Sequence, residues 1–450
     1  MNPKKYDGTS TVEDRELRRS GRQPMYAPTE KIRILEVDNF PLLGKVAAFR
    51  FVEWVLKNPG GVVSLPTGKT PEFFINWVQR ILGRWEKKEI QAMLAEYGIG
   101  GANKPDMRSL SFVQIDEFYP MDANQRNSFN WYVREFYIKG FGLDPAKALL
   151  IDATSLGLPP GKTMEEIFPD NLVDLSLRVR QTRTESERLQ KETINRVDWF
   201  CTEYERKIRE LGGIGFFLGG IGPDGHIAFN VRGSSFYSVT RLTGTNYETQ
   251  AAAATDLGGI EISRSRLVIT IGLSSITYNL NATAIIIAAG DAKASIVRMA
   301  VEEHQNPQYP ASSLHELPNA RFYLSRGAAS LLTERKFVDF KMAASIDAIQ
   351  SDEIVIQLAL RKEKKLDDLV EKDFTGDRFA AELMSKSGAS ARDLALATKQ
   401  RMMKKIEKGV EHVGKKTFLH TEPHHDDIML AYLPYLYHLV RDPENRHYFA

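Results

Sequence analysis

Short apolar runs alternate with amphipathic, helix-like stretches from Lys31 to about Ser330, and this alternation constrains the fold more than any other feature. It predicts a doubly wound α/β fold, with a mostly parallel sheet and helices on both faces. In such folds ligands bind beyond the carboxyl ends of the strands, so the residues just after each run matter most. The runs are Ile32–Val37, Val62–Leu65, Leu110–Ile115, Ile214–Leu218, Leu267–Ile271, Ala284–Ala289 and Phe322–Leu324.

The two ends of the chain lack this alternation. Residues 1–27 are polar and charged, which predicts a flexible arm before a globular domain at residues 28–330. Residues 331–413 are highly charged with a helical pattern, so we expect a helical linker whose charge runs are solvated helix faces. A short, incomplete α/β segment is expected at residues 414–450.

The composition narrows the functional class. A chain of 450 residues predicts two or three structural units. Its 60 Lys and Arg against 58 Asp and Glu give no footprint for nucleic acid or membrane, so small-molecule partners are expected and a homo-oligomer is left open. The single cysteine, Cys201, excludes zinc–thiolate sites and fits a reducing compartment. The start of the chain has no apolar signal region, and together these features predict a cytoplasmic protein.

The stretch Val62–Phe74 contains Gly68-Lys69-Thr70, which invites a nucleotide-binding interpretation. A P-loop needs a glycine where Val63 stands, so this is not an ATP-binding loop. Thr70 and Pro71 instead predict the N-cap and first residue of a helix. A loop between a strand and a helix start, comprising Thr67, Gly68, Lys69 and Thr70, can hold one phosphate, although an ordinary turn without a ligand is an equal alternative.

Two groups of titratable residues also follow apolar runs. Asp116 and Glu117 come directly after Val113–Ile115 and are candidates for acid/base chemistry, or for capping the next helix. Asp224 and His226 lie in the glycine-rich segment 219–230, where a carboxylate two residues from an imidazole can orient it. His226 is the first histidine of the chain, and a purely structural hydrogen-bonding role is the alternative.

These segments resemble the glucosamine-6-phosphate deaminases over about residues 31–330. The resemblance is carried by LPTGKTP, QIDEFY, the Ser128-Phe129 pair, LGGIGPDGHIAFN, the GSS at residues 233–235 and GDAK at residues 290–293. The 6-phosphogluconolactonases share the fold and a G-x-G-x-D-G-H block, but the Ile-Ala-Phe-Asn continuation after His226 favours the deaminases.

The resemblance implies specific roles. The loop at Thr67–Thr70 would hold the phosphate of a sugar phosphate, with Lys293 as a cation beside it. Asp116 would move a proton between C2 and C1, and His226, oriented by Asp224, would open the sugar ring. Further substrate-site residues implied are Glu117, Gly220 and Gly222. The family's reaction, which gives fructose 6-phosphate and ammonium, needs no metal or organic cofactor.

Three positions depart from the family pattern. Val231 stands where the family has a glutamate that supports the histidine, and Gln250 stands where it has a phosphate-binding arginine. Lys69 replaces a small residue in the phosphate loop and can restore the missing charge. We therefore keep three hypotheses: a deaminase of low rate or altered specificity, a non-catalytic sugar-phosphate-binding module, and a 6-phosphogluconolactonase-like hydrolase.

A second resemblance lies near the end of the chain. The segment His424-His425-Asp426-Asp427 is similar to the motif of the LmbE-like zinc N-deacetylases, which implies His424 and Asp427 as zinc ligands and Asp426 as base. A solvated turn is the alternative. Only 23 residues follow Asp427 in the 450-residue chain, with His438 and His447 as candidates for the third ligand. Because such a domain needs about 200 residues, we expect a fragment that holds zinc only when complete.

Overall fold

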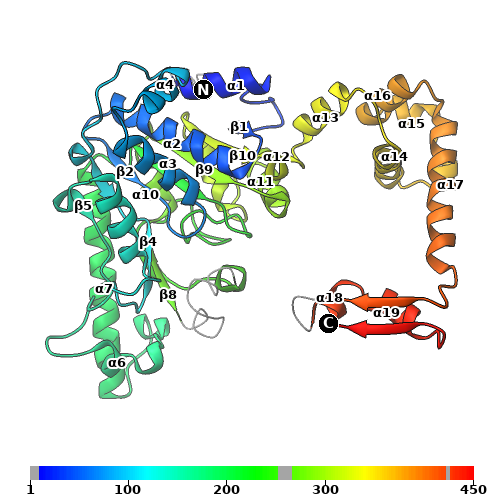
Figure 1. Cartoon of the computed structure of the whole chain (residues 1–450). Coiled ribbons are helices and arrows are strands. Elements are labelled where there is room, and N and C mark those ends of the chain that lie inside the picture. Colours follow the sequence, from blue (N-terminus) through cyan, green and yellow to red (C-terminus); the bar gives the residue numbers. More distant parts are fainter. Residues whose placement is uncertain (1–9, 252–265, 422–425) are drawn as a thin grey trace. The chain divides into compact units, whose positions relative to one another are not determined.

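The computed structural model describes residues 10–251, 266–421 and 426–450, and the chain divides into two compact units, Met1–Lys336 and Phe337–Ala450 (Figure 1). The division falls inside helix α13 (Thr333–Met342), close to the predicted domain end at residue 330. Among the described helices, none combines the length and the apolar character that crossing a membrane requires.

A seven-stranded parallel sheet forms the centre of the first unit and confirms the predicted fold class. Almost all of its residues are buried, because helices cover both faces, and this explains why the strands are predominantly apolar instead of alternating between apolar and polar residues. In spatial order the strands are β1 (Arg33–Val37), β10 (Ala320–Ser325), β9 (Thr283–Ala288), β6 (Phe216–Gly220), β2 (Val62–Ser64), β3 (Ser111–Val113) and β5 (Ala148–Leu149).

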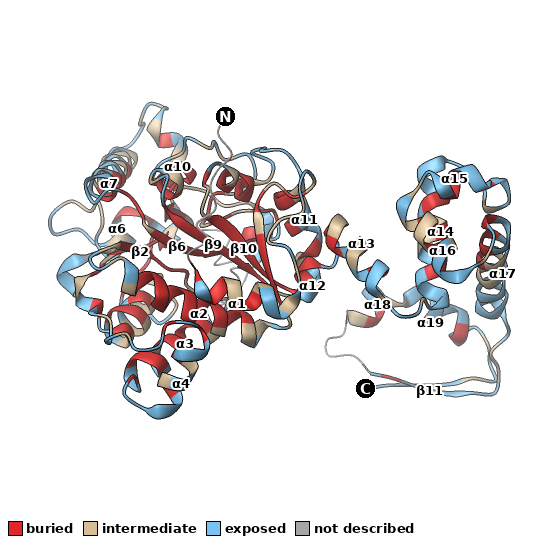
Figure 2. Ribbon diagram, turned by 90° about the horizontal axis from the view of Figure 1, so that it is seen from above, coloured by how far each residue is buried: buried red, intermediate tan, exposed pale blue. Residues whose placement is uncertain are grey.

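Two hydrophobic cores lie on opposite faces of this sheet. Neighbouring residues of one strand belong to different cores: Ile285 and Ile287 contribute to one, and Ile286 to the other. Figure 2 shows the buried strands between the two helical layers. One layer comprises α1 (Thr11–Ser20), α2 (Phe40–Lys57), α3 (Glu72–Gly83) and α4 (Lys88–Glu96), and the other α7 (Glu185–Glu210), α10 (Leu273–Thr277) and α11 (Ala294–Glu302).

A second, antiparallel sheet of three strands carries part of the candidate site. Its order is β4 (Asp116–Tyr119), β8 (Leu267–Thr270) and β7 (Arg241–Thr243). The apolar run at Leu267–Ile271 is therefore a strand, as its composition predicts, but it pairs outside the main sheet. The remaining helices of this unit include α5 (Phe129–Tyr132), a π-helix (Val133–Lys139), α6 (Met164–Ile167) and α12 (Arg326–Ala329).

The N-terminal residues correct one expectation. The described part of the predicted flexible arm forms helix α1, which begins at an N-cap on Ser10 and buries Val12 and Glu13. The Glu13 carboxylate accepts hydrogen bonds from Tyr323 (2.5 Å) and from Arg321 and Arg50. Burial by itself raises the pKa of Glu13, but the two guanidinium groups outweigh it and lower the pKa. A charged segment can thus be well packed when its charges are paired.

The helices of the second unit form a core of their own, so residues 331–413 are more than an extended linker. Phe374 and Leu383 are among its most buried side chains. A Ser- and Gly-rich stretch separates two of the helices: Gly388 ends one in the left-handed conformation and Ser390 caps the next. The helices are α14 (Ala348–Lys362), α15 (Glu371–Thr375), α16 (Arg378–Ser387) and α17 (Ala391–Val410).

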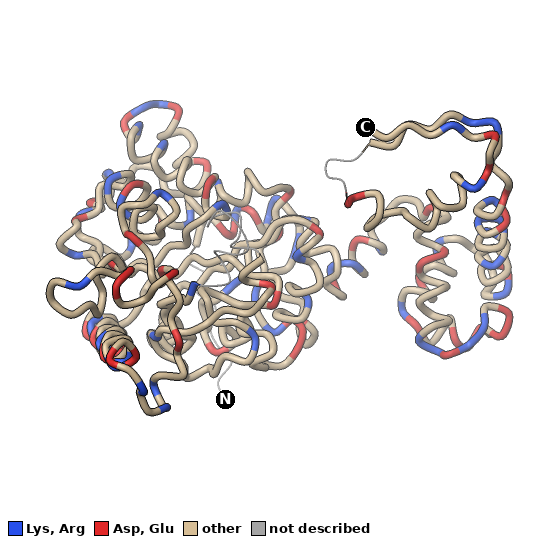
Figure 3. The backbone as a smooth tube through the Cα atoms, turned by 90° about the horizontal axis from the view of Figure 1, so that it is seen from below, with Lys and Arg blue, Asp and Glu red and all other residues tan. Residues whose placement is uncertain are grey.

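Acidic and basic residues are interspersed along these helices (Figure 3). Arg401 pairs with Asp352 at 2.6 Å and Lys364 with Asp373 at 2.7 Å. Both aspartates are buried, so these pairs lie against the helical core and not on the solvated helix faces that the sequence predicts. The chain then forms a parallel pair of strands with two helices between them: β11 (Thr417–His420), α18 (Asp427–Ala431), α19 (Leu433–Val440) and β12 (Arg446–Phe449).

Candidate active site

The loop that follows β2 has the shape of a phosphate cradle. Gly68 has a φ of 80°, which favours glycine, and the backbone N–H groups of Gly68, Lys69 and Thr70 donate to no group among the described residues. Helix α3 begins at Glu72 and its N-cap is Pro71. The prediction that Thr70 is the N-cap is therefore wrong. Its side chain instead lies beside Gly220, within the cavity wall. Backbone donors and a helix start are suited to an anion.

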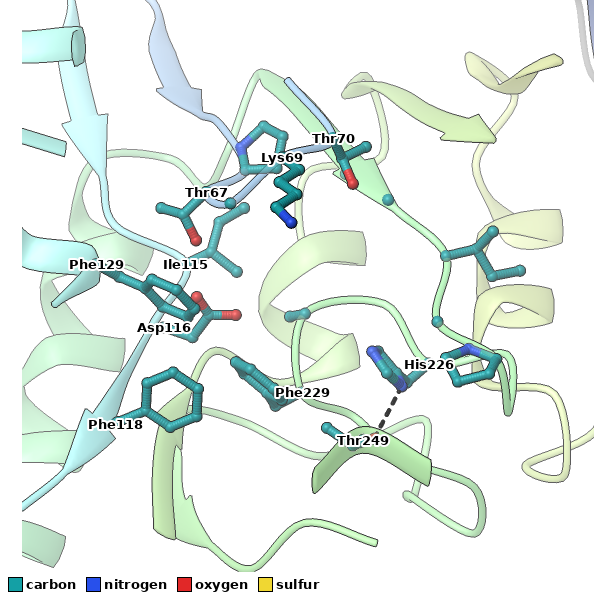
Figure 4. A pocket seen from close by; sticks show the side chains of 18 of the residues that line it. Thr67, Lys69, Thr70, Ile115, Asp116, Phe118, Phe129, His226, Phe229 and Thr249 are labelled. Atoms are coloured by element: carbon teal, nitrogen blue, oxygen red, sulfur yellow. Dashed lines mark hydrogen bonds between the residues drawn. The ribbon is translucent and has the colours of Figure 1, made fainter. Parts of the chain in front are cut away.

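This loop borders a cavity of about 350 Å³. In Figure 4, Thr67 and Lys69 project into the cavity from one side, while Asp116 and His226 face it from two others. The lining residues come from the loop, from the ends of β3 and β6, from β4 and α5, from the residue before α11, and from the segments between these elements. They are Pro66, Thr67, Gly68, Lys69, Thr70, Ile115, Asp116, Phe118, Phe129, Gly219, Gly220, Ile221, Gly222, Pro223, His226, Ala228, Phe229, Thr249 and Lys293.

Asp116 is the buried carboxylate of the cavity, with 6% of its surface exposed. It begins β4, where it pairs with Thr270 of β8, and its side chain faces the cavity beside Phe118 and Phe129 (Figure 4). Burial, and secondarily the neighbouring charge of Glu117, raise the pKa of Asp116 well above its usual range. A buried carboxylate with a raised pKa is the kind of group that acts as a general base.

Glu117 points away from the cavity, which corrects its assignment to the substrate site. Its carboxylate accepts hydrogen bonds from Ser128 Oγ (2.6 Å) and from the N–H groups of Asn130 (2.7 Å), Phe118 (2.9 Å) and Phe129 (3.1 Å). Burial raises the pKa of Glu117 to about 7 in spite of these donors. Adjacent strand residues face opposite ways, so only one of the pair reaches the cavity. Glu117 holds the start of α5.

His226 and Asp224 form the predicted pair. The imidazole Nδ1 lies 2.5 Å from Asp224 Oδ1, and the ring borders the cavity while Asp224 is buried behind it. Burial by itself raises the pKa of Asp224, but the hydrogen bond from His226 and further donors outweigh it and lower the pKa. A Cβ at Gly222 would lie 2.0 Å from the imidazole, so this glycine leaves the space that the ring occupies.

Two lysines line the cavity. Lys293, directly before α11, donates to the carbonyl oxygen of Ile221 at 2.9 Å. Burial lowers the pKa of Lys293, although the charge of Asp224 opposes the shift. Lys69 projects from the phosphate loop and is more exposed. The cavity therefore combines two cations and free backbone donors with a carboxylate and an imidazole.

Known proteins with similar sequences cover the first unit. No protein-family model matches the chain. Glucosamine-6-phosphate deaminase 2 of Homo sapiens is 27% identical over 316 residues, which are 69% of this chain and 93% of that protein. The glucosamine-6-phosphate deaminase of Halothermothrix orenii is 26% identical over 302 residues, 67% of this chain and 100% of that protein. The chain is thus similar in sequence to the glucosamine-6-phosphate deaminases.

Two solved structures are also similar to this chain. A monomeric glucosamine-6-phosphate deaminase has a TM-score of 0.49 and 23% identity, and the match covers 66% of this chain and 99% of that protein. A 6-phosphogluconolactonase from Leishmania guyanensis has a TM-score of 0.43 and 16% identity, over 68% of this chain and 100% of the other.

The structure places the positions that depart from the deaminase pattern. Gln250 does not line the cavity; its amide donates to the carbonyl oxygen of Thr245 at 3.1 Å. Val231 follows the glycine-rich segment and places no polar group beside His226. Lys69 lines the cavity, as expected for a replacement cation.

Sequence patterns missed several residues of the site. Phe118, Phe129 and Phe229 form an apolar wall beside Asp116, with ring centroids 5.0–6.2 Å apart. Thr249 lies 3.2 Å from the imidazole Nδ1. The phenylalanines lie within the segments that carry the resemblance, so they were detectable as neighbours of functional residues. Thr249 directly precedes Gln250, but its contact with His226 depends on the tertiary fold.

The predicted zinc ligands remain a prediction. His424 lies outside the described residues, while Asp426 and Asp427 stand at the start of α18. The described part of the second unit does bring His412, Asp442 and Glu444 together, with His412 paired to Asp442 at 2.8 Å, but these are not the predicted ligands. The relatives named above are deaminases, so they bear only on the first unit.

Proposed function

We propose that the first unit converts glucosamine 6-phosphate and water into fructose 6-phosphate and ammonium. The observation that carries this proposal is the arrangement of one cavity: a phosphate loop and Lys293 border it together with Asp116 and His226. The similarity to glucosamine-6-phosphate deaminases supports the same reaction.

The substrate's phosphate binds at the loop. The N–H groups of Gly68, Lys69 and Thr70, the hydroxyl groups of Thr67 and Thr70, and the ammonium groups of Lys69 and Lys293 supply the donors. Two cations suit a dianionic phosphate, and Lys69 supplies a charge in the absence of an arginine at position 250. Anchoring the phosphate directs the sugar towards Asp116 and His226.

His226 opens the sugar ring. Its Nδ1–H donates to Asp224, so the opposite nitrogen, Nε2, can take the proton of the anomeric hydroxyl group and return it to the ring oxygen as the C1–O5 bond breaks. Asp224 is fixed as a carboxylate, which stabilises the imidazolium ion formed between the two transfers. The product is the open-chain aldehyde.

Asp116 then moves a proton within the open chain. It removes the proton from C2, which gives an enolamine, and delivers it to C1, which leaves an imine at C2. Water adds to the imine carbon and the amine leaves, so that ammonium and the ketose are formed. No oxidant or reductant is consumed: besides the proton transfers, the C1–O5 bond and later the C2–N bond break, and water adds to C2. We propose that the unit needs neither a metal nor an organic cofactor.

The test measures ammonium and ketose 6-phosphate from purified full-length chain, with Asp116→Asn as the matched variant. The amide has the shape of the carboxylate but cannot take the proton, so product should disappear while sugar-phosphate binding persists. The rate should survive dialysis against a chelator. Binding without product in the unchanged chain would refute the proposal and favour a binding module. Hydrolysis of 6-phosphogluconolactone without ammonium release would favour the hydrolase hypothesis.

A further inference from the structure

We infer that Asn246 and Thr249 are positioning residues for the pair His226–Asp224, a role that rests on the proposed function for its effect on rate. Both belong to the segment between β7 and the end of the described range at residue 251. Their hydrogen bonds connect them to the pair.

The four side chains close a ring of hydrogen bonds. Asn246 Nδ2 donates to Asp224 Oδ2 at 2.6 Å, and Asn246 Oδ1 accepts from the N–H group of Thr249 at 3.0 Å. Thr249 Oγ1 lies 3.2 Å from His226 Nδ1, which in turn lies 2.5 Å from Asp224 Oδ1. The ring therefore starts and ends at the imidazole and passes through both oxygens of the carboxylate.

This arrangement fixes both the plane of the carboxylate and the tautomer of the imidazole. Asp224 Oδ2 accepts from Asn246 and also from the N–H group of Arg232 at 3.0 Å, so the carboxylate cannot rotate without losing donors. An ionised carboxylate only accepts, so His226 Nδ1 carries the proton. Thr249 Oγ1 accepts a second branch of the same N–H bond. The Nε2 atom is left as the acceptor that ring opening needs.

The ring compensates for the apolar residue at position 231. Val231 cannot hydrogen-bond to the imidazole, so support on the side of Nδ1 comes from Asp224 and Thr249. Thr249 is only 2% exposed, so its contact with the imidazole is shielded from water. A hydrogen bond shielded in this way holds an orientation better than an exposed one.

The experiment compares Thr249→Val, which keeps the shape but removes the hydroxyl group, with Thr249→Ser, which keeps the hydroxyl group. Steady-state kinetics give kcat and KM for ammonium release. Long-range ¹H–¹⁵N NMR spectra of the full chain report the tautomer of His226, whose signals are assigned by their loss in His226→Gln. The NMR measurement does not depend on turnover.

For Thr249→Val we expect kcat to fall about tenfold, which is the effect of one hydrogen bond, with KM within about twofold. The Nδ1–H signal of His226 should shift, because this N–H group loses the second branch of its hydrogen bond, and Thr249→Ser should restore both measurements. Asn246→Asp, which places a carboxylate against Asp224, should shift the His226 signals further. Unchanged His226 signals in Thr249→Val would overturn the inference even if the unchanged chain is active. An inactive wild-type chain with the expected NMR change would refute only the proposed function.

Discussion

Replacing Gly222 by alanine should disable His226 without unfolding the protein. A Cβ at this position would lie 2.0 Å from Cε1, 2.2 Å from Nδ1 and 2.3 Å from Nε2 of the imidazole. The φ of Gly222 lies outside the left-handed region, so the backbone accepts alanine. Since the imidazole is the end of a rotatable side chain, we expect the ring to swing away and lose its 2.5 Å contact with Asp224.

The size of the effect follows from what the displaced ring does. General acid–base catalysis contributes about 10²–10⁴ in rate, so kcat for Gly222→Ala should fall by a factor in that range. Crowding should reduce the free energy of unfolding by about 1–3 kcal/mol. Ammonium release and thermal unfolding measure the two quantities. Gly244→Ala is the matched control, because no described residue has a heavy atom within 4 Å of a Cβ there.

A double variant makes this test specific. If Gly222→Ala acts through the imidazole, adding it to His226→Gln should lower kcat no further, because the two changes remove the same group. The reasoning is refuted if Gly222→Ala keeps kcat within about twofold of the unchanged chain, or if the two losses multiply in the double variant.

Three further predictions concern the other groups of the cavity and its support. Burial raises the pKa of Asp116, so its carboxylate form, which acts as the base, is lost as the pH falls. A pH profile of kcat/KM should therefore rise with pH on its acidic side, and Asp116→Asn should abolish this rise. Lys293→Ala and Lys69→Ala should each weaken phosphate binding by about 1.5–3 kcal/mol, or about ten- to a hundredfold in KM, whereas the exposed Lys87→Ala should change nothing. Glu117 has its pKa raised from 4.5 to about 7, so its stabilising contribution is complete below pH 4.5 and is lost as the pH rises through 7, a change of about 3 kcal/mol in unfolding free energy. Denaturant titrations at several pH values should show that Glu117→Gln lacks this dependence of the unfolding free energy on pH. An unchanged dependence would contradict the raised pKa of Glu117.

The fold could be predicted because the main sheet is buried on both faces. Runs such as Ile214–Leu218 and Ala284–Ala289 are apolar throughout, and this pattern identifies parallel strands covered by helices. Helix α1 escaped prediction for the opposite reason. Glu13 is buried against arginine residues that lie far away in sequence, and hydropathy cannot reveal such pairs.

The candidate site was predictable where local sequence fixes the geometry. Asp224 and His226 lie two residues apart, so their contact is nearly decided by the chain itself. For the pair Asp116 and Glu117, sequence could not tell which carboxylate reaches the cavity, because that depends on the direction of β4. The contact between Thr249 and His226 spans 23 residues and depends on tertiary structure.

The short helical segment from Ser128 to Tyr137 connects the two ends of the cavity. At its start, Ser128 Oγ donates to Glu117, next to the proposed base. Further along, Tyr132 donates to the carbonyl oxygen of Gly68 at 2.9 Å, and Tyr137 donates to that of Pro66. The segment therefore ties the phosphate loop to the residue next to Asp116, and in the proposed reaction the separation of these two points limits the length of the sugar phosphate that fits.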